Sequence, residues 1–181
     1  MMELADDMDS GRRINPSIYR PRTLKNELEA NGQRRRLPAR RCVEIAIKLV
    51  RGLQILHESG FTHRDVRPSN IIFVNDVPKL ADIDLLAGND AALASYIPRN
   101  YAAPEGSHSN LADIFSLGKT LYEMCTGLPV QAYPSLPPDV RYWHDHQLLL
   151  KLNKIMARAC ARDLRKRYNS AQMLNALECI D

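Results

Sequence analysis

The sequence predicts a mainly α-helical fold of the α+β class, in which one small β hairpin accompanies the helices. Several segments carry apolar residues every three or four positions, the spacing of one face of a helix. Two short apolar runs flank a two-residue turn signal, the pattern of a hairpin. A chain of 181 residues with 45% hydrophobic and 25% charged residues is long enough for one compact unit with a real core.

The first thirty residues predict little regular structure. Residues 1–5 are short and apolar, and we interpret them as the end of a strand. Residues 8–22 are polar and contain a glycine and two prolines, so they predict a loop. Thr23 can cap a short helix that runs to about Asn31, where Gly32 ends it.

The middle of the chain predicts one long helix followed by the hairpin. From Ala39 to Ser59 the apolar residues follow the amphipathic helical pattern, and Gly60 is a natural stop. Ile71–Val74 and Val77–Leu80 read as two strands. Asn75-Asp76 between them tolerates the left-handed backbone that a tight hairpin turn needs.

The last third of the chain predicts helices joined by irregular segments. Residues 88–108 carry turn residues and little periodicity, and so does the proline-containing stretch 127–138. Between them, Leu111 to Cys125 is strongly apolar and predicts a buried helix. Two further helices are predicted at about Asp145 to Cys160 and Ser170 to Ile180.

Composition indicates a soluble chain in a reducing compartment, which we take to be the cytoplasm. The four cysteines form no C-x-x-C pair, and we interpret them as buried, reduced thiols: Cys42, Cys125, Cys160 and Cys179. No apolar run approaches the roughly 18 residues of a membrane span, and the acidic N-terminus lacks a signal-peptide pattern.

The net charge of +4 decides little by itself, but five arginines crowd one short segment: Arg34, Arg35, Arg36, Arg40 and Arg41. No aromatic residues alternate with these cations, so we expect a solvated connector between helices and no nucleic-acid partner. His144 and His146 do not share a helical face, which argues against a metal pair. Trp143 reads as a packing anchor.

One motif carries the chemistry. His63-Arg64-Asp65 to Asn70 has the form H-R-D-x-x-x-x-N, and Asp82 follows. Phosphoryl transfer needs one group for the attacking hydroxyl, here Asp65, and oxygen ligands for metal, here Asn70 and Asp82. Because a hairpin brings its two ends together, we expect Asn70 and Asp82 to lie near one another.

This layout resembles the eukaryotic-like Ser/Thr protein kinases, and more narrowly their bacterial members. The order of the motifs matches along nearly the whole chain. After the H-R-D motif, Asp82-Ile83-Asp84 stands at the D-F-G position and Ala103-Pro104-Glu105 at A-P-E. Asp113 through Gly118 matches D-x-x-x-x-G of the central helix, and Arg167 matches a late family arginine. The resemblance implies the large C-terminal lobe of the kinase fold.

The resemblance also implies roles at the reaction centre. Asp65 would accept or orient the proton of a substrate hydroxyl, with Arg67 in the place of the usual lysine near the transferred phosphate. Asn70 and Asp82 would hold Mg²⁺ ions that bridge the phosphates of ATP. Glu3 and Ala5 would belong to the interlobe hinge that contacts the nucleotide.

Other matched residues would have structural or regulatory roles. His63 and Ile83 would pack in the internal spine, and Arg64 would pair with an anionic group on the activation segment. Asp113 would brace the backbone of the catalytic loop.

Near the end of the activation segment, Glu105 and Arg167 would form a buried ion pair. That pair would tie the segment to the helical lobe.

The sequence departs from the family in two regions. It contains no G-x-G-x-x-G, and we expect a kinase-like domain truncated at the hinge: hinge about 1–7, loop 8–22, large lobe 23–181, N-terminal β lobe absent. In the activation segment Asp84 replaces the glycine of D-F-G, Ile97-Pro98 replaces Gly-Thr, and no threonine lies between Asp82 and Glu105.

Two functions remain open. One is ATP-dependent phosphoryl transfer to a protein Ser/Thr hydroxyl, which these departures would impair in this chain alone. The other is a truncated pseudokinase that scaffolds a protein partner without phosphoryl transfer. For either, we expect an apolar lobe face through which the chain associates with a partner.

Overall fold

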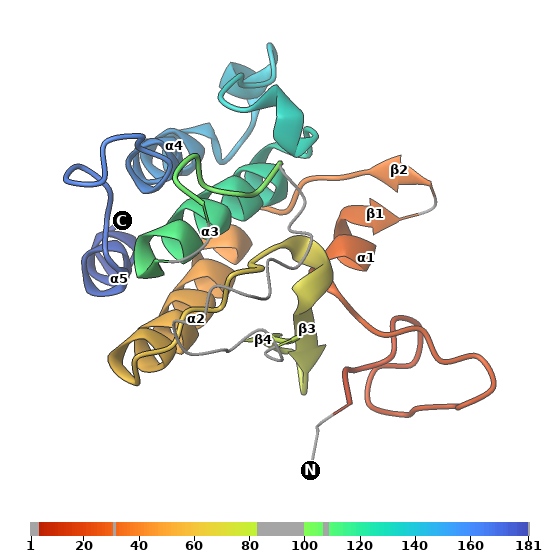
Figure 1. Ribbon diagram of the computed structural model, residues 1–181. Coiled ribbons are helices and arrows are strands. Elements are labelled where there is room, and N and C mark those ends of the chain that lie inside the picture. Colours follow the sequence, from red (N-terminus) through yellow and green to blue (C-terminus); the bar gives the residue numbers. More distant parts are fainter. Residues whose placement is uncertain (1–3, 31, 83–99, 107–108, 181) are drawn as a thin grey trace.

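The computed structural model describes residues 4–30, 32–82, 100–106 and 109–180 (Figure 1). Four helices of these ranges pack together into one body: α2 (Ala39–Glu58), α3 (Asn110–Thr126), α4 (His146–Ala159) and α5 (Ser170–Glu178). Their bounds lie within two residues of the sequence prediction, so the mainly helical α+β class is confirmed. Within the described ranges, no helix is both long and apolar enough to cross a membrane.

Helix α3 is the centre of the core. Its residues from Ala112 to Thr126 are buried almost without interruption, because α2 and α4 cover it on different sides. The Ser109 hydroxyl caps its N-terminus, and Gly127 ends it in the left-handed conformation with φ of 69°. A polar residue on this helix is therefore held in a fixed, water-poor position.

The hairpin forms as predicted. Strands β3 (Ile71–Val74) and β4 (Val77–Leu80) pair antiparallel, with Ile71 opposite Leu80. Asn75 and Asp76 both have positive φ, 53° and 64°, which is the two-residue turn that matches the twist of the strands. The hairpin lies against α2, next to residues 63–70, the H-R-D-x-x-x-x-N segment that is called the catalytic-loop motif below.

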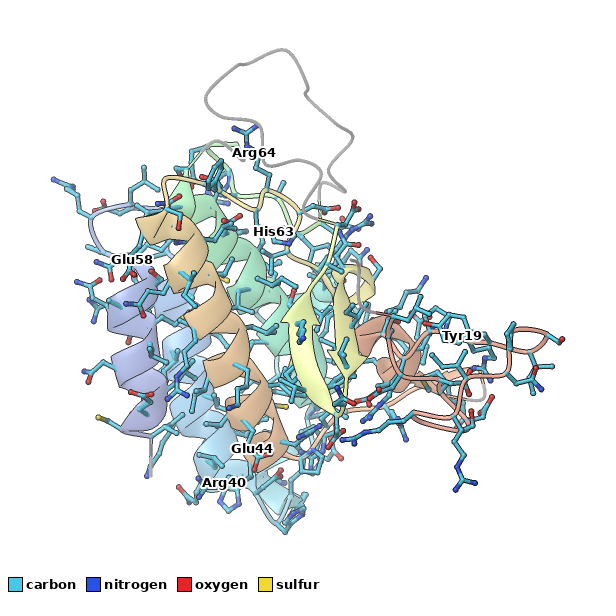
Figure 2. All side chains as sticks on the ribbon, turned by 90° about the horizontal axis from the view of Figure 1, so that it is seen from below. Tyr19, Arg40, Glu44, Glu58, His63 and Arg64 are labelled. Atoms are coloured by element: carbon cyan, nitrogen blue, oxygen red, sulfur yellow. The ribbon has the colours of Figure 1, made fainter. Side chains whose placement is uncertain are left out.

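The N-terminal segment is a loop fixed to the hairpin, so the prediction of a strand end is wrong for its described residues, 4 and 5. The Asp6 carboxylate accepts hydrogen bonds from the backbone N–H groups of Asn75 and Asp76, at 2.9 and 2.8 Å. The two N–H groups of the turn therefore find their acceptor on the N-terminal segment, outside the two paired strands. The rest of the loop, with Tyr19, extends away from the helices (Figures 1 and 2).

The short helix after Thr23 ends earlier than predicted. Helix α1 covers Leu24–Leu28, and the Thr23 hydroxyl accepts from the Asn26 N–H as expected of a cap. The next residues form a small antiparallel pair, β1 (Glu29–Ala30) with β2 (Gln33–Arg34). Gly32, with φ of 73°, supplies the turn, so the residue expected to stop a helix instead reverses the chain.

The prediction of a solvated connector holds only in part for the arginine run: Arg34, Arg35 and Arg40 are exposed, but the run also makes ion pairs with other segments. Arg34 pairs with the buried Glu123 of α3. Arg36 makes a two-pronged ion pair with Asp145, at 2.9 and 3.0 Å, while its guanidinium stacks 3.9 Å from the Trp143 ring centre. Asp145 also accepts from the N–H of Ala39 at 2.7 Å and so caps α2 from another segment.

Three of the four cysteines are buried free thiols, as predicted, whereas Cys179 is a free thiol that is exposed. Cys179 follows the last residue of α5 and lies beyond the face that this helix buries, so its side chain is exposed.

An ion pair between the buried Arg167 and the more exposed Glu105 ties the segment after residue 100 to the end of the helical body, so the pair predicted to be buried is buried only on the arginine side. The Arg167 side chain is 0% exposed and donates to both carboxylate oxygens of Glu105. Its remaining donors reach the carbonyls of Leu111 and Ala161, at 3.0 and 2.9 Å. Burial alone would raise the pKa of Glu105, but the hydrogen bonds from Arg167 outweigh it and hold that pKa below the ordinary value.

We predict that Glu105→Gln lowers the free energy of unfolding at pH 7 by about 1–3 kcal/mol, because the buried guanidinium loses its counter-charge. Since the folded-state pKa of Glu105 is lowered, its stabilising contribution is present above about pH 4.3 and is lost as the pH falls further. Urea unfolding of the two proteins between pH 3 and pH 7 measures this, with the exposed-loop variant Asp9→Asn as control. Equal stability of Glu105→Gln and wild type at pH 7 would show that the pair does not stabilise the fold.

Candidate functional site

The catalytic-loop motif is held from beneath by Asp113 of α3, whose side chain is only 1% exposed. Its two carboxylate oxygens accept from the backbone N–H groups of His63 and Arg64, both at 2.8 Å. His57 at the end of α2 adds a third contact, Nε2 to Oδ2 at 2.9 Å. Arg64 has φ of 70°, a left-handed conformation that costs a non-glycine residue about 1–2 kcal/mol, so these bonds offset local strain.

The carboxylate of Asp65 is buried. Described residues donate hydrogen bonds to one of its oxygens and none to the other. Its Oδ2 accepts from Asn70 Nδ2 at 2.7 Å and from Arg67 Nε at 3.0 Å. Asn70 Nδ2 also donates to the Asp65 carbonyl at 3.1 Å, which fixes the two residues to each other. Among the described residues, no group donates to Asp65 Oδ1. This oxygen is itself buried, so a hydroxyl reaches it only when the groups that cover it move aside.

The hairpin brings the segments of Asn70 and Asp82 together. The Ala81 N–H donates to the Asn70 carbonyl at 2.8 Å, so Asp82 lies just after the last hydrogen bond that joins the two sides of the hairpin. Asp82 is exposed and has φ of 63°. The amide oxygen of Asn70, which accepts from Ser69 Oγ at 3.2 Å, and the Asp82 carboxylate are the two hard oxygen donors at this edge.

These two donors suit a metal ion that arrives with a ligand. In the part of the chain that the structure describes, no group of three His, Cys, Asp or Glu residues is placed to hold a metal. Mg²⁺ commonly uses one or two protein oxygens and takes the remainder from phosphates and water. The residues present therefore fit Mg²⁺ bound to a nucleotide better than an ion held by protein alone.

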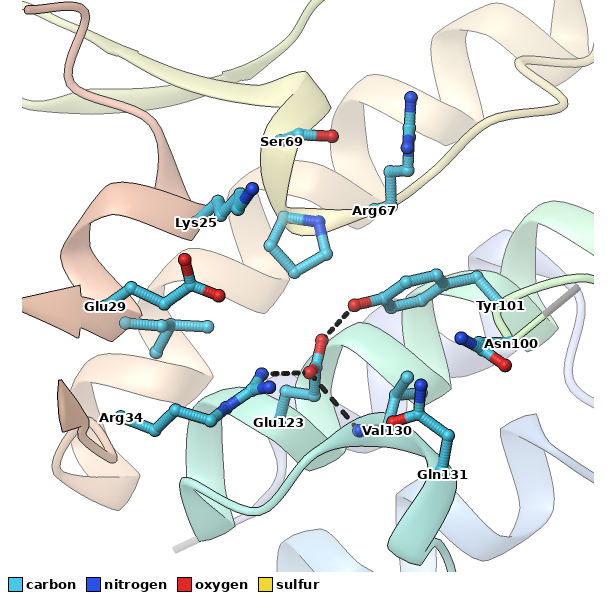
Figure 3. A pocket seen from close by; sticks show the side chains of 12 residues that line it. Lys25, Glu29, Arg34, Arg67, Ser69, Asn100, Tyr101, Glu123, Val130 and Gln131 are labelled. Atoms are coloured by element: carbon cyan, nitrogen blue, oxygen red, sulfur yellow. Dashed lines mark hydrogen bonds and ion pairs between the residues drawn. The ribbon is translucent and has the colours of Figure 1, made fainter. Parts of the chain in front are cut away.

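A cavity of about 250 Å³ opens beside Arg67, Pro68 and Ser69 (Figure 3). Glu123 lies at its base, 2% exposed, and accepts from the Tyr101 hydroxyl, from Arg34 and from the backbone N–H of Val130. Burial, and then the hydrogen bond to Glu123, raise the pKa of Tyr101 well above its ordinary value.

The contacts of Glu123 leave its carboxylate fully satisfied by groups of this chain. Glu123 was not among the site residues predicted from the sequence. The available signal was a glutamate inside the strongly apolar run from Leu111 to Cys125.

The remaining predicted residues lie beside Asp65, elsewhere in the fold or outside the described ranges. Glu3 and Ile83 are outside those ranges, as are the substituted positions of the activation segment from 83 to 99. Ala5 is 5% exposed, and its carbonyl accepts from the Tyr19 hydroxyl at 3.1 Å. His63 is completely buried, between α2 and the hairpin, whereas Arg64 lies near the surface (Figure 2).

The comparisons with known proteins agree with this arrangement. The family model of the protein kinase domain matches residues 17–177. A probable serine/threonine-protein kinase of Clostridium perfringens is 28% identical over an alignment of 171 residues, and the match covers 83% of this chain and 24% of that protein. A Wee1-like protein kinase of Arabidopsis thaliana is 28% identical over 145 residues, 75% of this chain and 29% of that protein.

A probable protein kinase of Dictyostelium discoideum is 33% identical over an alignment of 126 residues, and the match covers 67% of this chain and 34% of that protein. The chain thus spans only about a quarter to a third of the length of these curated relatives. With 161 of its 181 residues inside the matched range 17–177, the chain belongs to the protein kinase family.

Proposed function

We propose that this chain carries the phosphoryl-transfer centre of an ATP-dependent protein kinase that acts on serine or threonine hydroxyls. The observation that carries the proposal is the state of the Asp65 carboxylate. It is buried, one oxygen is fixed by Asn70 and Arg67, and the other has no donor among the described residues. A hydroxyl placed 2.6–3.2 Å from that oxygen would be oriented for attack and could give up its proton there.

The neighbours of Asp65 have separate parts in this proposal. The amide of Asn70 sets the direction of the carboxylate through its bonds to Oδ2 and to the Asp65 carbonyl. Arg67 brings a cation whose side chain is 31% exposed, so it can also approach the phosphoryl group that is transferred. Phosphoryl transfer depends mainly on such positioning and charge stabilisation, because the protein forms few bonds itself.

ATP and Mg²⁺ are the proposed cofactors. The Asn70 amide oxygen and the Asp82 carboxylate would hold the metal at the open edge of the hairpin. When bound, the metal would neutralise phosphate charge. The proposed substrate is a protein, which the similarity of the chain to protein kinases supports.

The second candidate is a binding module that scaffolds a protein partner without phosphoryl transfer. The substitution at Asp84 favours it, because an aspartate in place of glycine adds a negative charge two positions after Asp82 in the sequence. Exposed apolar side chains at Leu4, Ile55 and Val77, which are 66%, 68% and 42% exposed, would support association with such a partner.

We predict that this chain binds Mg-ATP weakly, with a dissociation constant of about 1 mM or above, because the sequence contains no glycine-rich phosphate loop to enclose the nucleotide. Calorimetric titration with and without Mg²⁺ measures this. Dissociation constants near 1 μM that depend on Mg²⁺ would contradict it.

We predict that Asp65→Asn lowers the rate of phosphoryl transfer to a general protein substrate by about 10²–10⁴-fold, since the amide cannot accept the hydroxyl proton. The assay follows radiolabel from ATP. Asp9→Asn, on a loop side chain that is 69% exposed, is the matched control and should leave the rate unchanged.

If wild type and Asp65→Asn transfer label at the same rate, Asp65 does not serve the reaction. The scaffold proposal replaces the kinase proposal if the folded wild type transfers no label and if wild type and Asp65→Asn bind a protein partner equally well.

A further inference from the structure

The N-terminal loop, residues 8–20, is built around the side chain of Asp7. Oδ1 of this carboxylate accepts from the backbone N–H groups of Asp9 and Ser10, at 3.0 and 2.9 Å, and Oδ2 accepts from the N–H of Arg20 at 2.8 Å. The hydrogen bond from Arg20, and then that from Ser10, lower the pKa of Asp7 to about 2. The base of the loop is therefore fixed by hydrogen bonds to one buried carboxylate.

Two further contacts fix the loop relative to the rest of the chain. The Tyr19 hydroxyl donates to the Ala5 carbonyl at 3.1 Å, and the Arg22 N–H donates to the Asp6 carbonyl at 2.7 Å. From this base the loop extends away from the helices (Figures 1 and 2). All but one of residues 9–18 are exposed, so the outer part of the loop packs on little of its own chain.

Two cations and two apolar side chains of this loop are exposed to solvent. Arg12 and Arg13 are exposed, and neither side chain has a partner among the described residues. Asp9, the one acid of the loop, is already paired with another arginine at 3.3 Å. Ile14 and Ile18 are 36% and 70% exposed. The outer part of the loop is therefore a surface with unpaired positive charge and apolar side chains.

The order of this loop contributes more to binding than to the fold. Its outer residues bury little apolar surface, so holding them in place gains little hydrophobic stabilisation for the chain. A loop that is already held in place loses less conformational entropy when a partner binds. A guanidinium can also donate two parallel hydrogen bonds to one carboxylate. Unpaired arginines beside isoleucines therefore select a partner that is acidic and also carries apolar side chains.

Among acidic partners, the loop favours a protein over a nucleic acid or a membrane. Tyr19 is its one aromatic residue and is partly buried, with its hydroxyl bound to Ala5, so no ring is free to stack on a base. Two arginines near an anionic membrane contribute only about 2 kcal/mol, which is too little for stable attachment. A fixed loop with both charge and apolar groups suits the shaped surface of a protein.

We propose that the N-terminal loop is a docking site for an acidic protein segment that carries apolar side chains. Carboxylates of the partner pair with Arg12 and Arg13, and its apolar side chains lie against Ile14 and Ile18. This binding does not depend on the proposed phosphoryl transfer, because none of these four residues belongs to the candidate functional site.

The test titrates an acetylated and amidated peptide of four Glu-Glu-Leu repeats into the full chain and follows backbone amide signals by NMR. A peptide of four Gln-Gln-Leu repeats is the uncharged control. We expect saturable shifts that are largest at Arg12, Arg13 and Ile18. The acidic peptide should bind about 3- to 30-fold tighter than its control, from two exposed ion pairs. No saturable shift up to about 10 mM, or equal binding of the two peptides, would overturn the proposal.

Variants at exposed positions place the peptide on the loop. Arg12→Gln combined with Arg13→Gln removes both cations and should lower the affinity for the acidic peptide to about that of the uncharged one. Ile18→Ser should weaken both peptides about 3- to 10-fold, because it removes an apolar contact. Lys151→Gln, on the exposed side of α4, removes a cation elsewhere and should change neither. Unchanged affinity for the acidic peptide in the double arginine variant would contradict the proposed site.

Vesicles that contain phosphatidylserine distinguish a protein partner from a membrane. We expect little of the wild-type chain to sediment with them, because two arginines attract it only weakly. Sedimentation of the wild type that the double arginine variant abolishes, together with no saturable shift from the acidic peptide, would assign the loop to a membrane and overturn the proposal.

Discussion

The carboxylate of Asp113 is the interaction on which the candidate site depends. It sits on the most deeply buried helix, and its two oxygens hold the N–H groups of His63 and Arg64. Without that acceptor the left-handed conformation of Arg64 would be unfavourable and the loop would be free to relax. The direction of the Asp65 side chain, and through it that of Asn70, follows from a backbone fixed from beneath by the core.

Other parts of the molecule are organised in the same way, by an acid on one element and a donor on a distant one. Glu123 holds Arg34, Asp145 holds Arg36 and the start of α2, and Asp6 holds the turn of the hairpin. These contacts join segments that periodic packing alone would leave loosely connected. They explain how short strands and irregular loops keep a defined position around a helical body.

The sequence was sufficient for the features that depend on local chemistry. The long amphipathic pattern predicted α2, and the dipeptide Asn75-Asp76 predicted the turn of the hairpin. The spacing of Asp65 and Asn70 predicted two residues that prove to be hydrogen-bonded. The ion pairs of the arginine run were not predictable, because nothing in the local sequence indicates that Glu123 and Asp145 lie opposite it in the fold. The same reason hid a cavity between α2 and β4, whose lining residues His63, Gly52 and Leu80 meet only after the hairpin docks on α2.

The central claim is that Asp113 fixes the backbone of the catalytic loop, and amide hydrogen exchange of Asp113→Asn tests it most directly. The asparagine side chain keeps one acceptor oxygen where the carboxylate offers two. We expect the exchange rate of His63 or Arg64 to rise by about 10- to 100-fold, since a hydrogen bond to a charged group is lost. Amides in the middle of α2, such as that of Leu49, should keep their protection. Unchanged exchange at both His63 and Arg64 in a folded variant would contradict the account.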